Sequence, residues 1–437
     1  MASSHPKVLW DGHRADMRCV YLVDANRRKN ASRWDSEPTD FWGQGQPSGA
    51  AQIAHLGDER EAYLRRRHNS TTPGIDLHLP ITVSEILARL PPKPLLRCRA
   101  VSPAWRRATS TRDFLLSHHA RQPALPLLCS HSDVADGGQS LDVTLFDHRA
   151  GVAAADQFQR VARLKTPPLE GGIDGSESFT PLFYPVASCD GLLLLSIECD
   201  LCICNPATRQ YAPLEQLDGF MTVGLYPHPL TGEYRLLLYH ETDQRAIYVF
   251  SIGSNQPPRR IGRPDPLAGD GLLFRGSLHW HTGNRIMVFD TATESFRQIR
   301  APVAHEDYGR LFEMDDMLGI FFLNDEKTTV DIWVMQDYQG EVWAFKCRVE
   351  LPVAEIRDRC QNSSHIEEVM VVNGDGELLV LVGFEDWLFQ VDIDGKLIAS
   401  FHARGLPSYN IVHKQTLVQH TFFPTLEGYV MNDSPFI

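Results

Sequence analysis

Residues 188–209 read SCDGLLLLSIECDLCICNPATR, and this stretch contains the two signals that decide the fold. The Asp190-Gly191 pair comes directly before four leucines, which is typical of a tight β-hairpin because Asp and Gly tolerate positive φ. A second apolar segment follows and ends in Asn205-Pro-Ala-Thr208, a polar turn that leads into a further strand. The stretch therefore predicts short antiparallel strands joined by tight turns.

Both signals recur along the rest of the chain. The hairpin signals are centred on positions 191, 232, 276, 316 and 376, and their spacing of 41, 44, 40 and 60 residues is typical of β-propeller blades. We expect blades at about 179–214, 220–262, 268–300, 308–350 and 366–402, with an insertion near 352–365 that explains the longest step. A sixth blade would combine 125–165 with 410–421 and close the ring, which removes the open sheet edges. Seven blades is the alternative.

The formal net charge of −13 over 437 residues is unevenly distributed. Residues 1–75 carry +2, residues 76–121 carry +5 and residues 122–437 carry −20. The acidic total argues against a general nucleic-acid binder, because phosphate contacts need a basic surface. The asymmetry indicates that the chain has two surfaces with different partners.

Nothing in the sequence predicts membrane insertion or export. The densest apolar run, 191–197, is the length of a strand, whereas a membrane span needs about 18–20 residues. Nine cysteines at irregular spacing, with no secretory signal in residues 1–14, indicate free thiols in a reducing compartment. We expect a protein of the cytoplasm and/or nucleus. Residues 1–75 show no helix or strand period, and we expect them to be disordered.

Residues 76–121 contain the start and stop signals of several short helices. Thr82 or Ser84 can cap a first helix, prolines separate it from a second, and Ser102 can cap a third that residues 113–120 extend. Three helices in so short a segment cannot bury all of their apolar side chains. Some of these side chains should therefore be exposed for a partner, unless the helices pack on the β-rich region.

This segment resembles an F-box. The resemblance lies in Leu79-Pro80, Glu85-Ile86-Leu87, Arg89-Leu90-Pro91, Leu95-Leu96-Arg97-Cys98-Arg99, Val101-Ser102 and Trp105-Arg106. It implies binding to a Skp1-type adaptor, and through that adaptor to the cullin of a ubiquitin ligase. The net charge of +5 suits such an acidic adaptor. By resemblance, the Skp1-binding residues would be Leu79, Pro80, Ile86, Leu87, Leu90, Pro91, Leu95, Leu96, Arg97, Val101 and Trp105.

Residues 122–437 resemble the F-box-associated domain of plants, which is related to kelch-type propellers. The segments that carry this resemblance are Ser188–Leu193, Asn205–Arg209, Phe289–Phe296 and Val330–Val334. The two resemblances together imply a mainly β protein: a short three-helix F-box followed by a β-propeller of about six four-stranded blades. They also imply a non-catalytic substrate-recognition subunit, whose propeller binds an unidentified target protein.

A function of another class remains open at this point. The chain could be a stand-alone propeller that binds proteins or sugars and never engages a ligase. In that case the apolar face of the helices would be covered by the propeller. Exposure of Leu79, Leu87, Leu95 and Leu96 would argue against this alternative.

No catalytic, cofactor or metal motif is evident. Phosphate loops, nucleophile elbows and HExxH sequences are all missing, so an enzyme is not favoured. Cys199, Cys202 and Cys204 could suggest zinc, but no partner pair follows at metal spacing and we expect free core thiols. Trp280, Trp333, Trp343 and Trp387 are expected to pack between blades, with the mouth of the central channel as the alternative.

Overall fold

The computed structural model describes residues 81–133, 139–149, 157–165, 183–197, 200–240, 243–262, 267, 271–303, 309–360, 366, 368–374, 377–384, 387–402, 406–423 and 436. The predicted disorder of residues 1–75 lies outside these residues, as do Leu79 and Pro80.

Four short helices lie next to one another in the sequence: α3 (Ile81–Arg89), α4 (Pro92–Val101), α5 (Pro103–Thr109) and α6 (Arg112–Arg121). The hydroxyl oxygen of Ser102 accepts a hydrogen bond from the Trp105 amide at 3.3 Å, which confirms the predicted cap of the third helix. The sequence predicts that residues 113–120 extend that helix, and this is wrong. Thr111 has an extended backbone and caps α6 separately, so the helical module has four helices.

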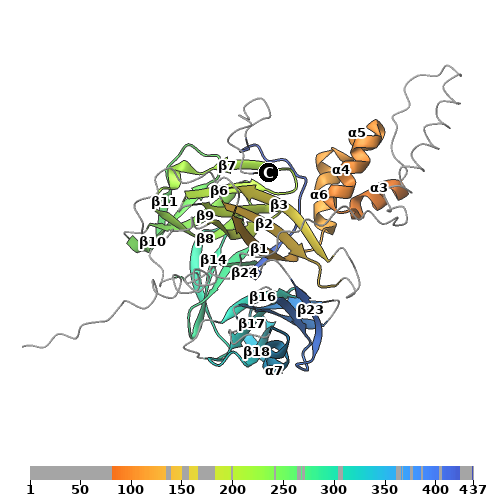
Figure 1. Cartoon of the computed structure of the whole chain (residues 1–437). Helices are drawn as coiled ribbons and strands as arrows, with labels where there is room; N and C mark the ends of the chain where they lie inside the picture. The colour runs from red at the N-terminus through yellow and green to blue at the C-terminus, as the bar shows by residue number, and fades with distance from the viewer. Residues whose placement is uncertain are drawn as a thin grey trace, which may run out of the picture. The chain divides into compact units, whose positions relative to one another are not determined.

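After the helices, the strands form six antiparallel four-stranded sheets within the described part of the chain (Figure 1). The first sheet contains β24 (Leu406–His413), β1 (Leu125–Asp133), β2 (Gln139–Phe146) and β3 (Phe158–Lys165). The second contains β4 (Phe183–Cys189), β5 (Leu192–Ile197), β6 (Asp200–Asn205) and β7 (Gln210–Pro213), and the 3-10 helix η2 (Glu215–Leu217) follows it. The third contains β8 (Phe220–Pro227), β9 (Tyr234–His240), β10 (Asp243–Ser251) and β11 (Arg259–Gly262).

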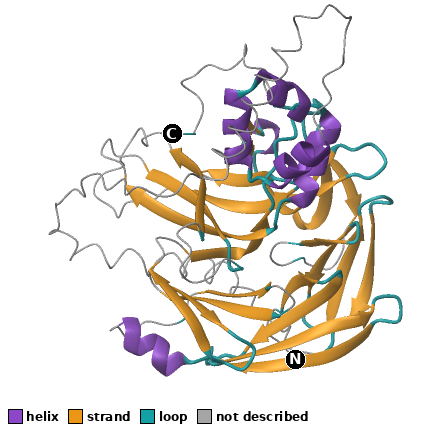
Figure 2. Ribbon diagram, turned by 90° about the vertical axis from the view of Figure 1, so that its right-hand side faces the viewer, coloured by secondary structure: helices purple, strands orange, loops and turns teal. Residues whose placement is uncertain are grey.

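The other three sheets follow in chain order. The fourth sheet contains β12 (Leu272–Phe274), β13 (Ser277–His281), β14 (Arg285–Asp290) and β15 (Ser295–Arg300). The fifth contains β16 (Arg310–Met314), β17 (Met317–Leu323), β18 (Thr329–Asp337) and β19 (Val342–Glu350). The sixth contains β20 (Glu368–Asn373), β21 (Leu378–Phe384), β22 (Trp387–Val391) and β23 (Leu397–His402). Figure 2 shows the strands in orange, and the sheets are the blades of a six-bladed β-propeller. The prediction of a propeller with six four-stranded blades is confirmed.

The predicted tight hairpins are confirmed at 191, 276 and 316, but the prediction is wrong at 232, where Pro227 pairs with Tyr234 and residues 228–233 form a longer loop, and residues 375–376 lie outside the described part of the chain. Cys189 pairs with Leu192, so only Asp190 and Gly191 form the loop, with φ of 49° and 82°. Positive φ at both loop positions matches the right-handed twist of the flanking strands. The loops at 275–276 and 315–316 repeat this arrangement in two further blades.

The turns between the third and fourth strands also follow the sequence signal. The Asn205 side-chain oxygen accepts hydrogen bonds from the amides of Ala207 and Thr208, at 3.1 and 3.3 Å. The Asp290 carboxylate does the same for Ala292 and Thr293 at 3.0 and 2.8 Å. These side chains satisfy turn amides and fix where the third strand of each blade ends.

Ring closure uses the C-terminal strand, but earlier than predicted. β24 pairs with β1 in the same sheet and also contacts β4 and β20 in the two neighbouring blades. The predicted blade that combines 125–165 with a C-terminal strand is confirmed, but of the expected residues 410–421 only 410–413 lie in that strand, because β24 ends at His413. The expected insertion near 352–365 contains a helix, α7 (Val353–Cys360), whose Ile356 is fully buried between the last two blades.

Apolar side chains fill the spaces between neighbouring blades. Trp280 is 1% exposed and packs among residues of the third and fourth sheets, and its indole nitrogen donates to the Val223 carbonyl at 3.0 Å. Trp343 and Trp387 lie beside other inter-blade clusters. Trp333 is half-buried and contacts Phe345 edge-on. The predicted packing between blades is confirmed for Trp280.

Candidate partner-binding site

The helical module has a small apolar core. Leu87 and Leu95 are completely buried and Trp105 is 4% exposed, and they pack together with Cys98 and Leu115. These side chains come from α3, α4, α5 and α6, so the core ties all four helices together. Of the sequence-predicted adaptor-binding residues, Leu87, Leu95 and Trp105 therefore hold the module together instead of forming its surface.

Two residues from the far end of the chain complete this core. Residues 414–423, which we call the strap, follow β24, and their Leu417 and Val418 are 3% and 7% exposed in the same cluster as Leu87, Leu95 and Trp105. An apolar core of so few residues is marginal by itself. The strap therefore supplies apolar area that the four helices lack.

Polar contacts hold the strap against α6. The His119 Nδ1 atom donates to the Gln415 carbonyl at 3.0 Å, and the Lys414 ammonium donates to the Ala120 carbonyl at 3.1 Å. The other ring nitrogen of His119 lies 3.7 Å from the Asp190 carboxylate in the β4–β5 hairpin. The nearby His119 ring is the main cause that lowers the pKa of this carboxyl group, and burial opposes it. The contact joins the helical module to the second blade.

The strap then packs on the propeller itself. Phe423 is 5% exposed and belongs to the cluster between the second and third blades. The rings of His420 and Tyr234 meet edge-on, with centroids 5.1 Å apart. Thr416 is fully buried, and its side chain lies directly over Gly191. One ten-residue segment thus contacts the helices and two blades.

Several apolar side chains of the helical module lie at its surface. Ile86 is 45% exposed, Leu96 is 40% exposed and Val101 is 63% exposed. We call these three residues the exposed apolar set. Large apolar side chains exposed on a small helical module make it the candidate surface for another protein.

The remaining sequence-predicted residues have intermediate or exposed positions. Pro91 and Arg97 are exposed and Leu90 is half-buried. Sequence reasoning missed Leu116, which is 44% exposed on α6, and it missed Leu417 and Val418 entirely. The strap residues lie too far from the helices in sequence for any local pattern to connect them.

Buried hydrogen bonds fix how the helices meet. Leu90 directly follows the end of α3. The Nε2 atom of His118 lies 2.8 Å from the Leu90 carbonyl oxygen, and the Gln122 side chain donates to the same oxygen at 3.2 Å. Burial lowers the pKa of His118, so this ring is neutral near pH 7. The Arg99 Nε donates to the Thr109 hydroxyl at 2.9 Å and joins α4 to α5.

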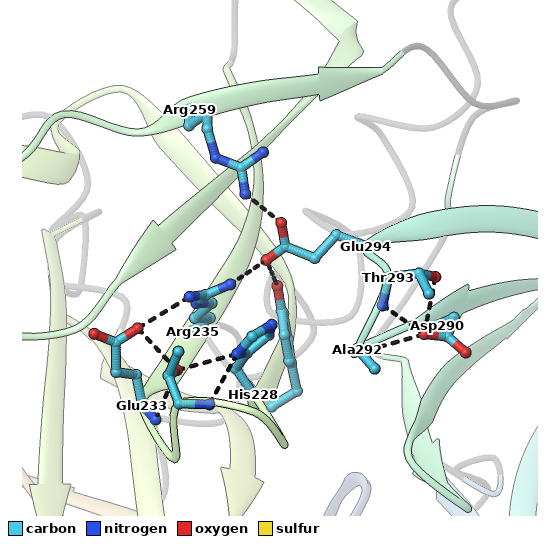
Figure 3. A network of polar contacts seen from close by, with 10 residues as sticks. His228, Glu233, Arg235, Arg259, Asp290, Ala292, Thr293 and Glu294 are labelled. Atoms are coloured by element: carbon cyan, nitrogen blue, oxygen red, sulfur yellow. Dashed lines mark hydrogen bonds and ion pairs between the residues drawn. The ribbon is translucent and has the colours of Figure 1, made fainter.

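The propeller contains a comparable polar cluster between its third and fourth blades (Figure 3). The Glu294 carboxylate accepts hydrogen bonds from Tyr226 at 3.1 Å and Arg235 at 2.6 Å, and it also pairs with Arg259. Burial alone would raise the pKa of Glu294, but the two arginines outweigh it and the pKa lies below its ordinary value. The cluster is a structural ion-pair network, because the Glu294 carboxylate is already bound by side chains of the propeller.

The cysteines are structural within the described residues. Cys202 and Cys204 are buried in the second blade, and burial raises the pKa of Cys202 to about 12. Both are free thiols, and the described part of the chain contains no group of His, Cys, Asp or Glu residues placed to hold a metal ion. Cys199 lies outside the described residues. Among the helices that the structure describes, none is long and apolar enough to cross a membrane.

The structure combines a six-bladed propeller with a four-helix module that carries exposed apolar side chains. Comparison with protein families gives the same division: the F-box associated beta propeller domain matches residues 173–423, and the F-box domain matches residues 77–117. The chain belongs to the family of plant F-box proteins with a C-terminal F-box associated β-propeller domain.

Similar proteins carry the same kind of name. The chain is 24% identical over 375 residues to F-box protein CPR1 of Arabidopsis thaliana, which covers 75% of this chain and 84% of that protein. It is 29% identical over 273 residues to the F-box/LRR-repeat/kelch-repeat protein At1g09650 of the same plant, with 52% and 66% coverage. Among solved structures, the β-propeller domain of Cps50 (Swd1) from Myceliophteria thermophila superposes with a TM-score of 0.35 at 9% identity, covering 64% of this chain and 87% of that one.

Proposed function

We propose that this protein is the substrate-recognition subunit of a Skp1–cullin–F-box ubiquitin ligase. The F-box match at residues 77–117 in the same chain as the propeller carries this proposal. The helical module binds the Skp1-type adaptor, and the propeller binds a target protein. The subunit needs no covalent chemistry of its own, since tethering raises the effective concentration of a target lysine near the ubiquitin-loaded enzyme.

Within this proposal the predicted adaptor-binding residues divide into two groups. The exposed apolar set, together with Pro91 and Arg97, makes the contact with the adaptor. Leu87, Leu95 and Trp105 support that surface from beneath. A variant that replaces Leu95 or Trp105 would therefore lose adaptor binding by unfolding the module, and would not test the contact itself.

The matched experiment uses surface variants. We expect Ile86→Asp combined with Val101→Asp to abolish binding of a purified plant Skp1-type adaptor in calorimetry, because both side chains are already in water and the fold is retained. Leu230→Asp in the propeller, at a side chain that is 79% exposed, is the control and should bind normally. Equal binding by the double variant and the wild type would overturn the proposed contact.

The stand-alone alternative has one observation in its favour. Leu87 and Leu95 are covered, and strap residues from the C-terminal region help to cover them. Leu96 is exposed, however, as adaptor binding requires. Failure of the wild-type protein to bind any Skp1-type adaptor would leave the stand-alone function as the better proposal.

A further inference from the structure

A groove lies where the helical module meets the propeller. It has a volume of about 360 Å³ and is lined by residues of three segments that are distant in sequence. Leu96 and Arg99 come from α4, Ala207, Thr208 and Arg209 from the β6–β7 turn, and Leu417 and Gln419 from the strap.

The groove is continuous with the surface that we propose for the adaptor. Leu96 belongs to the exposed apolar set and also forms one wall of the groove. A partner that covers Leu96 therefore contacts the groove, whose lining also includes Ala207, Thr208 and Arg209 of the propeller.

The chemistry of the lining selects the occupant. Leu96, Ala207 and Leu417 give the lining an apolar part, whereas Arg99 and Arg209 bring two positive charges. The described lining residues include no carboxylate. An apolar side chain flanked by acidic residues would satisfy both parts of the groove.

We propose that the groove binds an acidic, amphipathic segment of the Skp1-type adaptor, so that the adaptor contacts the propeller as well as the helices. This inference rests on the proposed function and adds a second contact to it. The Arg209 side chain is exposed on a turn that belongs to the second blade, which gives the propeller a direct part in adaptor binding.

The test measures adaptor affinity by calorimetry for the full chain at low and moderate salt. Arg209→Glu should weaken binding by about five- to tenfold at low salt, and the loss should shrink as salt rises, because charge pairs at a rim are screened. Arg260→Glu changes the net charge equally at an exposed position on β11 and should bind as the wild type does. Arg209→Lys keeps the charge and should retain most of the affinity.

A second variant probes the groove without altering its charge. Gln419→Trp places a bulky ring at an exposed strap position that lines the groove and should also weaken binding several-fold. Wild-type affinity for both Arg209→Glu and Gln419→Trp, while the Ile86/Val101 double variant loses binding, would overturn the groove proposal and leave the proposed function standing. No binding by the wild type would overturn both.

Discussion

The propeller blades and the helical module bury their apolar side chains in different ways. Clusters between consecutive blades combine sheets that are close in sequence, such as the cluster of nineteen buried residues centred on the last two blades, and only where the ring closes does a described cluster join the first and last sheets. The helical core instead takes Leu417 and Val418 from beyond the final strand. The F-box segment of this protein is therefore local in sequence, but its apolar core is completed by residues from outside the segment.

The largest expected effect comes from breaking the shared core. Replacing Leu417 and Val418 together by Asp would place two carboxylates among Leu87, Leu95 and Trp105, which costs more than about 4 kcal/mol because the charges have no partners there. We expect amides of α3–α6 to lose hydrogen-exchange protection and adaptor binding to disappear, although the F-box sequence is intact.

The matched control for that variant is Val412→Asp, at a side chain that is 41% exposed on β24. It should leave the helices protected. Wild-type protection of α3–α6 in the Leu417/Val418 variant would show that the helical core does not need the strap.

Substitutions at two equivalent hairpin glycines distinguish the effect of the strap contact from the effect of the hairpin geometry. A methyl group on Gly191 would lie 2.5 Å from the Thr416 side chain, whereas nothing lies within 4 Å of a methyl group on Gly276. Both residues have positive φ, so Ala costs about 1 kcal/mol at either position. We expect Gly191→Ala to destabilise by about 3 kcal/mol in urea unfolding because the strap must also move. Equal losses at the two positions would contradict the close contact.

Two histidines, His413 at the end of β24 and His420 in the strap, should make stability depend on pH. Burial lowers the pKa of His413 and of His420 to about 4, from an ordinary value of 6.5. Between pH 6.5 and 4 the unfolded chain binds protons that the folded chain does not, so stability is full above pH 6.5 and falls as the pH drops towards 4. Each ring contributes at most about 3 kcal/mol to this loss.

Urea unfolding between pH 7 and 4.5 measures this dependence. His420→Gln should flatten the curve, whereas His402→Gln, at an exposed side chain on β23, should not. An unchanged slope for His420→Gln would mean that this ring takes up its proton equally in both states.

The smallest expected effect lies in the propeller. Glu294→Gln weakens the ion pairs with Arg235 and Arg259 but keeps the size of the side chain, and we expect a loss of about 1–2 kcal/mol. Because these pairs join only the third and fourth blades, adaptor affinity should not change. Reduced adaptor affinity in calorimetry would show that the blades and the helical module are coupled more tightly than their separate cores suggest.

Much of the propeller could be predicted from sequence because its signals are local. The two-residue loops at 190–191 and 275–276 and the polar turn at Asn205 each need only a few neighbouring residues to form. Closure of the ring by a C-terminal strand could be predicted as well, since a propeller leaves one blade to complete.

The candidate site was less predictable. Leu95 and Leu96 are adjacent in the sequence, yet one is fully buried and the other is 40% exposed, because the helix turns about 100° between them. The strap was missed because residues 414–423 have no strand or helix period, and their partners lie about 300 residues away. Only the folded chain brings these residues together.

The order of synthesis gives the strap a further consequence. Trp105 leaves the ribosome 312 residues ahead of Leu417, which is roughly 15–60 s of translation. During that interval the helices lack part of their core and the first blade lacks β24, whereas the other five blades have all of their strands in consecutive segments. A nascent or prematurely terminated chain therefore lacks a finished helical module, and on the proposed function it would engage the adaptor only after the ring has been closed.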